Sequence, residues 1–477
     1  MVFNSFDFLG FFLIVFAGVW VLGRITENPL PRNLWLLTLS YYFYGSFRIE
    51  FLALLLYVSL VTYLGGLWLD RLRSRENPHR KGALALIITL SLLPLLYWKY
   101  AGFLYGSVTG ALGLTPEANP FAGLLLPVGI SFFTFQALTY TIDIHRGKIA
   151  ADRNIIDVFL FVAFFPTLLS GPIERARKLL PQLKNTYRTD FNTLFSGAML
   201  FSWGLFKKMV VADRLAHYVD QIYFDPSAHS GATLCIAAIF YSIQIYCDFS
   251  GYSDMAIGVA RSIGFSLDKN FDQPYFVTSI REFWKKWHIS LTSWFTEYIY
   301  IPAGGNRVGK VRWVGNIFLV FLTSALWHGA AWSFLVWGAL HALYYLAEHL
   351  IHPNKEAVVH SRLRQFGSGI LVFALVTLAW IFFRIENIHD AFDIVKRIFT
   401  WAGTGVSFGT SSFSFVLTCV ALLLFFAGEL ALRHNALSFE NNPKQTLSLP
   451  NIWWMATTFL LISLLGVSGN GFVYFQF

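Results

Sequence analysis

The chain has 477 residues, of which 56% are hydrophobic and only 13% are charged, and its mean hydropathy is +0.54. Soluble proteins carry about 25% charged residues, so this composition excludes a soluble globular protein. Apolar runs of about 20 residues recur from end to end, and each could cross a bilayer as a helix. They predict an all-α polytopic membrane protein. Because the runs continue without a linker, residues 1–477 are predicted to form a single membrane-embedded domain.

The net charge of +9 comes from 36 Lys and Arg against 27 Asp and Glu. The basic residues lie mostly in short loops between apolar runs, where the positive-inside rule puts them. No long run of Lys and Arg is present. We therefore expect the lipid bilayer as a partner and no nucleic acid.

No metal site or disulfide framework is predicted. Three cysteines lie in or beside apolar segments, with no paired spacing: Cys235, Cys247 and Cys419. Three histidines straddle the end of a predicted helix at a spacing that matches no standard metal site: His341, His349 and His352.

The first apolar run, residues 6–23, lacks a basic n-region and a clear cleavage site. It is therefore predicted to be a membrane helix rather than a removed signal. Helices over 33–44 and 51–69 follow, and then comes the strongly basic loop 70–81. Because cytoplasmic loops are enriched in Lys and Arg, this loop is predicted to face the cytoplasm. Three crossings before it place the N-terminus outside.

Residues 83–100 predict a fourth crossing. The next apolar stretch, 126–136, contains Pro127 and Gly129, which predict a broken or tilted helix because such breaks are tolerated where neighbours satisfy the backbone. Both flanks of the run 158–169 are basic. One crossing cannot put both flanks inside, so this run is predicted to dip into the bilayer and return.

Further apolar runs lie at 193–211, 234–260, 314–326, 333–350, 369–383, 413–432 and 452–467. In all, roughly eleven crossings plus re-entrant or interfacial helices are predicted. Asp248 and Asp254 lie inside one run, where carboxylates need partners. We expect them to pair with Arg261 or to cap helix ends. The alternative is a proton pathway in a transporter.

A basic stretch leads into apolar residues at helical spacing: Trp284, Trp287, His288, Leu291 and Phe295. This spacing predicts one amphipathic helix over 283–295 at the cytoplasmic boundary. Its buried face includes His288, and Lys285 and Lys286 lie off that face.

His328 follows an apolar run and is the second histidine of this region. Ionisable residues at membrane depth tend to be kept for function. A neutral imidazole can act as a general base that takes the proton of an attacking hydroxyl. His328 and His288 are therefore predicted to be catalytic. The structural alternatives are a buried histidine bonded to backbone for His328 and an interfacial histidine for His288.

Seven blocks of residues, in order, resemble the membrane-bound O-acyltransferase (MBOAT) family of the bacterial alginate O-acetyltransferase type. They are 126–136, 164–166 with 170–173, 246–254, 270–271 with 274–275, 281–291, 300–307 and 326–332. The resemblance covers most of the chain, from Tyr41 to Arg384. The turn 304–307 is more similar to members that acetylate polysaccharides than to the D-alanyl transferases of teichoic acid.

The resemblance implies a ring of tilted transmembrane helices around a central funnel that opens to the cytoplasm. His328 matches the invariant catalytic histidine of the family, and His288 matches its second, supporting position. The implied donor is an acyl thioester, acetyl-coenzyme A, with no permanently bound cofactor. The expected donor-binding residues are Lys285, Lys286, Arg307 and Trp327. The basic ones could attract coenzyme A phosphates, or they could simply follow the positive-inside rule.

The resemblance also implies a function in the bacterial cytoplasmic (inner) membrane. The acetyl group would cross the membrane to a periplasmic SGNH-type acetyltransferase and polysaccharide machinery, for O-acetylation of an alginate-type exopolysaccharide. Two alternatives stay open. One is a transferase of D-alanyl or other acyl groups fed by a carrier protein, and the other is a polytopic transporter without acyl transfer.

Overall fold

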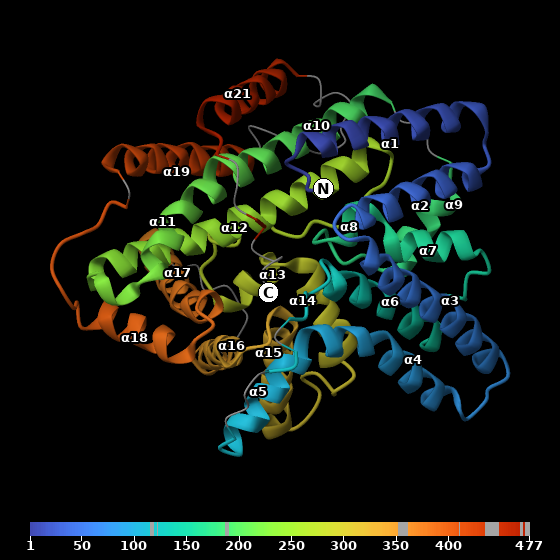
Figure 1. Ribbon diagram of the computed structural model, residues 1–477, viewed down its shortest axis with the longest axis horizontal. Helices are drawn as coiled ribbons and strands as arrows, with labels where there is room; N and C mark the ends of the chain where they lie inside the picture. Colours follow the sequence, from blue (N-terminus) through green and yellow to red (C-terminus); the bar gives the residue numbers. More distant parts are fainter. Residues whose placement is uncertain are drawn as a thin grey trace. The chain divides into compact units, whose positions relative to one another are not determined.

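Helices are the only regular elements in the computed structural model, which describes residues 1–114, 119–121, 123–186, 190–351, 361–409, 411–434, 448–467 and 471–472 (Figure 1). Eight helical segments in these ranges are long and apolar enough to cross a membrane. They are Phe6–Ile25 (α1), Ile49–Ser74 (η1 and α3), Arg80–Ala111 (α4, η2 and α5), Phe191–Phe224 (α10, η3 and α11), Gly231–Ser262 (α12), Trp332–Ile351 (α16), Arg362–Arg384 (α17) and Ser412–Arg433 (α19). The prediction of an all-α polytopic membrane protein is confirmed.

Three further helices coincide with predicted crossings. α2 (Pro29–Gly45) covers the predicted helix 33–44 but has only 17 residues. α15 (Lys310–His328) and the apolar α21 (Leu449–Leu465) cover the other two. Eight of the roughly eleven predicted crossings thus correspond to helices that are long and apolar enough to span, and the count of eleven stays a prediction. The ring around a central funnel stays a prediction.

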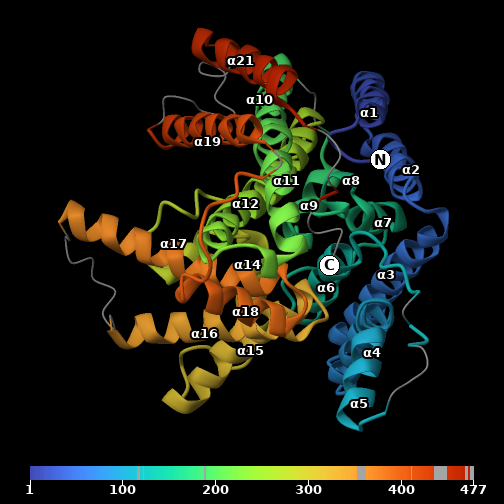
Figure 2. The same cartoon turned by 60° about the vertical axis from the view of Figure 1, so that its left-hand side comes forward.

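The described residues form two compact units. The first holds residues 1–202, apart from the gaps given above, together with 252–268 and 448–452. In it, α3 (Leu52–Ser74) packs against α4 (Arg80–Leu95), and both contact α6 (Ile130–His145); Figure 2 shows α3 beside α4. α7 (Ile155–Ala163) lies against α2 and α3. The expected single membrane-embedded domain is not tested by this division and stays a prediction.

The predicted break within 126–136 is wrong in position. Pro127 and Gly129 lie before a helix rather than inside one, because α6 begins at Ile130. Gly129 has φ +75°, a left-handed conformation that glycine adopts without strain. A Cβ at Gly129 would lie 2.4 Å from the carbonyl oxygen of Leu168. The glycine is therefore needed both for the turn into α6 and for the close approach of a second backbone.

The run predicted to dip into the bilayer is folded as two short helices. α7 has nine residues, and α8 (Phe165–Leu168) has four. At about 1.5 Å per residue, α7 is only about 14 Å long, whereas the hydrocarbon core is about 30 Å thick. Neither helix can cross, in agreement with the prediction that this run does not span. Its return to the same side stays a prediction.

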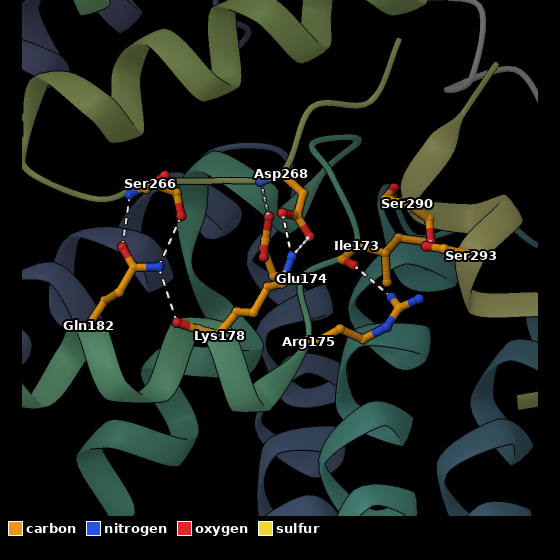
Figure 3. Close-up of polar contacts among 9 residues, drawn as sticks. All are labelled: Ile173, Glu174, Arg175, Lys178, Gln182, Ser266, Asp268, Ser290 and Ser293. Atoms are coloured by element: carbon orange, nitrogen blue, oxygen red, sulfur yellow. Dashed lines mark hydrogen bonds and ion pairs between the residues drawn. The ribbon is translucent and has the colours of Figure 1, made fainter. Parts of the chain in front are cut away.

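A polar seam joins α9 (Ala176–Lys184) to the segment after α12 within the first unit (Figure 3). The backbone N–H of Asp268 donates to Glu174 Oε1 at 2.6 Å, and Lys178 Nζ lies 2.7 Å from the Asp268 carboxylate. Gln182 exchanges two hydrogen bonds with the backbone of Ser266. Burial, with the Asp268 charge adding to it, raises the pKa of Glu174 to about 8.

The second unit holds residues 203–251 and 269–434, apart from the gaps given above, together with 453–467 and 471–472. In it, α15 packs along α16, and α16 packs along α17; Figure 2 shows α15 and α16 side by side. α13 (Ile280–Lys286) contacts α14 (Ile289–Phe295) and α16. Both predicted catalytic histidines belong to this unit.

Candidate active site

The prediction of a single helix over 283–295 is wrong, because the helix is interrupted at His288. α13 ends at Lys286 and α14 starts at Ile289. His288 lies between them with φ 43° and ψ 56°, in the left-handed region. Few residues other than glycine adopt this conformation, so helical spacing could not reveal the break. The burial pattern nevertheless agrees with the spacing: all five residues of the predicted apolar face are buried, and Lys285 is exposed.

Asn270 holds the turn at His288. Its backbone carbonyl accepts the N–H of Ile289 at 2.8 Å. Its side-chain Oδ1 lies 3.0 Å from His288 Nδ1, and it accepts hydrogen bonds from Ser290 Oγ at 2.9 Å and from the Ser290 backbone N–H at 3.3 Å. Asn270 and His288 are each 1% exposed. The left-handed turn is therefore stabilised from one buried side chain.

The two histidines lie together, although 40 positions separate them in the chain. Their ring centroids are 6.4 Å apart, with the planes inclined by 60°. His328 is the last residue of α15. Gly329 follows it, and a Cβ there would lie 2.0 Å from the ring of Phe334. A glycine after His328 thus lets the chain turn tightly behind the imidazole.

Aromatic rings surround both imidazoles. Phe249 meets the His288 ring edge to face, with centroids 4.6 Å apart, and the Trp327 centroid lies 5.7 Å from His288 and 4.8 Å from His328. Trp337 lies 5.2 Å from the His328 ring. Charged imidazolium is disfavoured in such surroundings, and burial lowers the pKa of His288 to about 3. At neutral pH His288 is therefore an uncharged imidazole.

A cavity of about 580 Å³ lies within the second unit, and both histidines line it. Its charged lining residues are Arg281, Glu282 and Lys285, and its aromatic ones are Trp284, Phe295, Tyr300, Phe321 and Tyr345. Arg281 Nε donates to the Glu348 carboxylate. This volume is within the range of about 300–1,000 Å³ that small-molecule sites occupy. The cavity can therefore bring a small reacting group to both imidazoles.

Of the four residues expected to bind a donor, Lys285 lines the cavity and is exposed. Lys286 lies 3.3 Å from Glu282, one helical turn earlier. Arg307 is exposed and is not among the lining residues, and Trp327 is buried beside both imidazoles. Only Lys285 therefore stands where it could meet a molecule in the cavity directly.

Asp248 forms an ion pair that sequence reasoning missed. Its carboxylate lies 2.7 Å from Lys208 Nζ, which also lies 2.8 Å from Asp213. A lysine inside the apolar run 193–211, such as Lys208, is itself a signal that buried carboxylates are near. Arg261, the partner expected from sequence, donates to Ser196 Oγ.

His341 is fully buried in α16, and neither of its ring nitrogens has a hydrogen-bond partner among the described residues. It packs against Trp284, with centroids 4.9 Å apart. His349 lies 4.6 Å from the Trp313 ring, and His352 lies outside the described residues. No group of three or more His, Cys, Asp or Glu that could hold a metal ion occurs in the part of the chain that the structure describes.

Residues 128–388 match the membrane-bound O-acyltransferase family. The probable alginate O-acetylase AlgI of Pseudomonas syringae pv. tomato is 40% identical over 84% of this chain and 76% of its own length. The peptidoglycan O-acetyltransferase of Helicobacter pylori is 33% identical over 83% of this chain and 79% of its own. The teichoic acid D-alanyltransferase of Streptococcus thermophilus is 25% identical over 71% of this chain and 80% of its own.

Proposed function

We propose that this protein takes an acetyl group from a cytoplasmic thioester, because the chain belongs to the membrane-bound O-acyltransferase family and is a multi-pass O-acyltransferase. The acetyl group then passes across the membrane for O-acetylation of an extracytoplasmic polysaccharide of the alginate type or similar. The observation that carries the proposal is the pair of buried imidazoles that line one cavity.

The reaction at this pair is acyl transfer from sulfur to oxygen. His328 takes the proton of the acceptor hydroxyl while the hydroxyl oxygen bonds to the carbonyl carbon of the thioester. The carbon–sulfur bond then breaks, and the proton held on the imidazole passes to the leaving thiolate. The two ring centroids lie 6.4 Å apart, and both rings line the same cavity. His288 supports this step from the other side of the reacting group.

The donor that we propose is acetyl-coenzyme A. Lys285 is an exposed cation on the lining, and such a cation attracts phosphate. Apolar and aromatic side chains make up half of the other lining residues, which suits a slender thioester arm. Among the relatives above, the O-acetylases are more similar to this chain than the D-alanyltransferase is, at 40% and 33% against 25% identity. Acetyl is therefore preferred to D-alanyl as the transferred group.

The partners and the location follow from the same proposal. The protein lies in the bacterial inner membrane with its N-terminus outside and the basic loop 70–81 in the cytoplasm. A periplasmic SGNH-type acetyltransferase receives the acetyl group and modifies the polymer together with the polysaccharide machinery.

The test compares His328→Ala with His217→Ala, a change at an exposed histidine of α11 (Asp213–Phe224) in the same unit. His328→Ala should lower acetyl transfer by about 10²–10⁴-fold at normal protein level, and His217→Ala should leave it unchanged. His288→Ala should impair transfer less than His328→Ala. Near-normal transfer by His328→Ala would refute the base role. If purified protein moves solute without consuming thioester, a transporter replaces the proposal.

A further inference from the structure

We propose that Asn270 is a positioning residue that fixes His288 as the tautomer with its hydrogen on Nδ1, so that Nε2 is the nitrogen that accepts a proton. The inference rests on the proposed acyl transfer. It assigns to His288 a supporting role in which Nε2 accepts a hydrogen bond or a proton. It excludes the opposite role, in which Nε2–H would donate to the oxyanion that develops on the carbonyl.

The first step is to identify the Asn270 atom that faces His288. An amide oxygen and an amide nitrogen are hard to tell apart by shape, so the hydrogen-bond network has to decide. The backbone N–H of Ser290 can only donate, and it points to this same atom at 3.3 Å. The Ser290 hydroxyl lies 2.9 Å from it. The atom is therefore the oxygen, which accepts and cannot donate.

The second step follows from the neutral charge of the ring. His288 Nδ1 lies 3.0 Å from that oxygen, so Nδ1 must carry the hydrogen. A neutral imidazole has one N–H, and the hydrogen bond made by one nitrogen sets the state of the other. Nε2 therefore keeps its lone pair and can accept a hydrogen bond or a proton, but it cannot donate.

The third step is that the arrangement is held in place. Ile289 donates its N–H to the Asn270 carbonyl at 2.8 Å, and Asp272 donates its own to the Lys286 carbonyl at 3.0 Å. These two backbone bonds fasten the segment that carries Asn270 to both ends of the break between α13 and α14. The His288 ring is also enclosed by Phe249, whose centroid is 4.6 Å away. Side chain and ring thus have little freedom to exchange partners.

The titratable groups around His288 bear on how its protonation is measured. His328 lies 6.4 Å away on α15. The other ionisable groups on the shared cavity are Arg281, Glu282, Lys285, Tyr300 and Tyr345. Asn270 contacts none of these side chains through the hydrogen bonds described above. A shift in the acidic limb of the pH–rate profile of an Asn270 variant would therefore report on His288.

The experiment uses the full-length protein with three variants. Asn270→Ala removes the acceptor, and Asn270→Asp keeps an oxygen there and adds a charge. Asn316→Ala is the matched control: Asn316 is also buried, at 6% exposure, and donates to the carbonyls of Ala303 and Gly305 without contacting either histidine. Each is assayed for turnover of acetyl-coenzyme A against pH.

Asn270→Ala should lower kcat by about 10–100-fold, the loss seen when a group that orients a metal-bound histidine is removed, and should change KM by less than about threefold. In Asn270→Asp the carboxylate favours the imidazolium, so the acidic limb should move up by about 1–3 pH units. Activity above that limb should recover relative to Asn270→Ala. Asn316→Ala should move neither the limb nor the ratio of kcat to KM.

A direct readout needs no turnover. In protein labelled with [¹⁵N]histidine and free of donor, the resonance lost in His288→Gln should show a proton on Nδ1 and none on Nε2. A proton on Nε2 in the unsubstituted protein would overturn the inference, as would full activity and an unchanged spectrum in Asn270→Ala. If the tautomer is as stated but the protein consumes no thioester, the proposed function fails and the positioning by Asn270 stands.

Discussion

Removing the Lys208 ammonium should destabilise the protein far more than breaking a surface ion pair. Lys208 is 4% exposed and lies within 2.8 Å of Asp213 and Asp248, which are 1% and 2% exposed. Lys208→Met keeps most of the stem and takes away the cation that the two carboxylates share. Removing one partner of a buried pair costs about 3–5 kcal/mol. At about 1.4 kcal/mol per factor of ten, the folding equilibrium falls roughly a hundredfold to three-thousandfold.

The assay is thermal unfolding in detergent together with the protein level in membranes. Lys178→Met is the matched control, because Lys178 also lies 2.7 Å from a carboxylate, that of Asp268, but the two side chains are 51% and 41% exposed. An exposed pair contributes about 0–1 kcal/mol. Lys178→Met should therefore unfold close to the unsubstituted protein, well above Lys208→Met.

A triple variant separates the loss of charge from the loss of pairing. Lys208→Met with Asp213→Leu and Asp248→Leu leaves no charge in the cluster, and apolar side chains of similar volume often replace a buried ion pair without cost. It should recover most of the stability lost in Lys208→Met. Equal unfolding temperatures for Lys208→Met and Lys178→Met would refute the reasoning. A triple variant that is stable but inactive would instead favour a proton pathway through Asp248.

Two further predictions concern pH and topology. Burial raises the pKa of Glu174 to about 8, above the value of about 4.3 in the unfolded chain. The contribution of Glu174 to stability is therefore complete below about pH 4.3 and is lost as pH rises through about 8. Glu174→Gln should flatten this fall in melting temperature, and an unchanged slope would contradict the assignment. A cysteine at the exposed Arg75 should react with an impermeant maleimide only from the cytoplasmic side; reaction only from outside would reverse the proposed topology.

The sequence by itself determined the class of fold and most of the crossings. A helix satisfies its own backbone hydrogen bonds, so an apolar run long enough to span is sufficient evidence for it. The runs at 234–260 and 413–432 lie within α12 and α19 for this reason. His288 and His328 could likewise be singled out, because an ionisable residue in apolar surroundings stands out locally.

Tertiary structure decided what these residues contact. Asn270 and His288 are 18 positions apart, and Lys208 and Asp248 are 40 apart. No local periodicity encodes such pairs, because they depend on how separate segments pack. The left-handed conformation of His288 could not be predicted for the same reason. Its spacing fits a helix, but backbone hydrogen bonds from the segment that carries Asn270 stabilise a turn there. Periodicity reports which face of a helix is apolar, whereas the direction of the chain at a single residue depends on distant donors and acceptors.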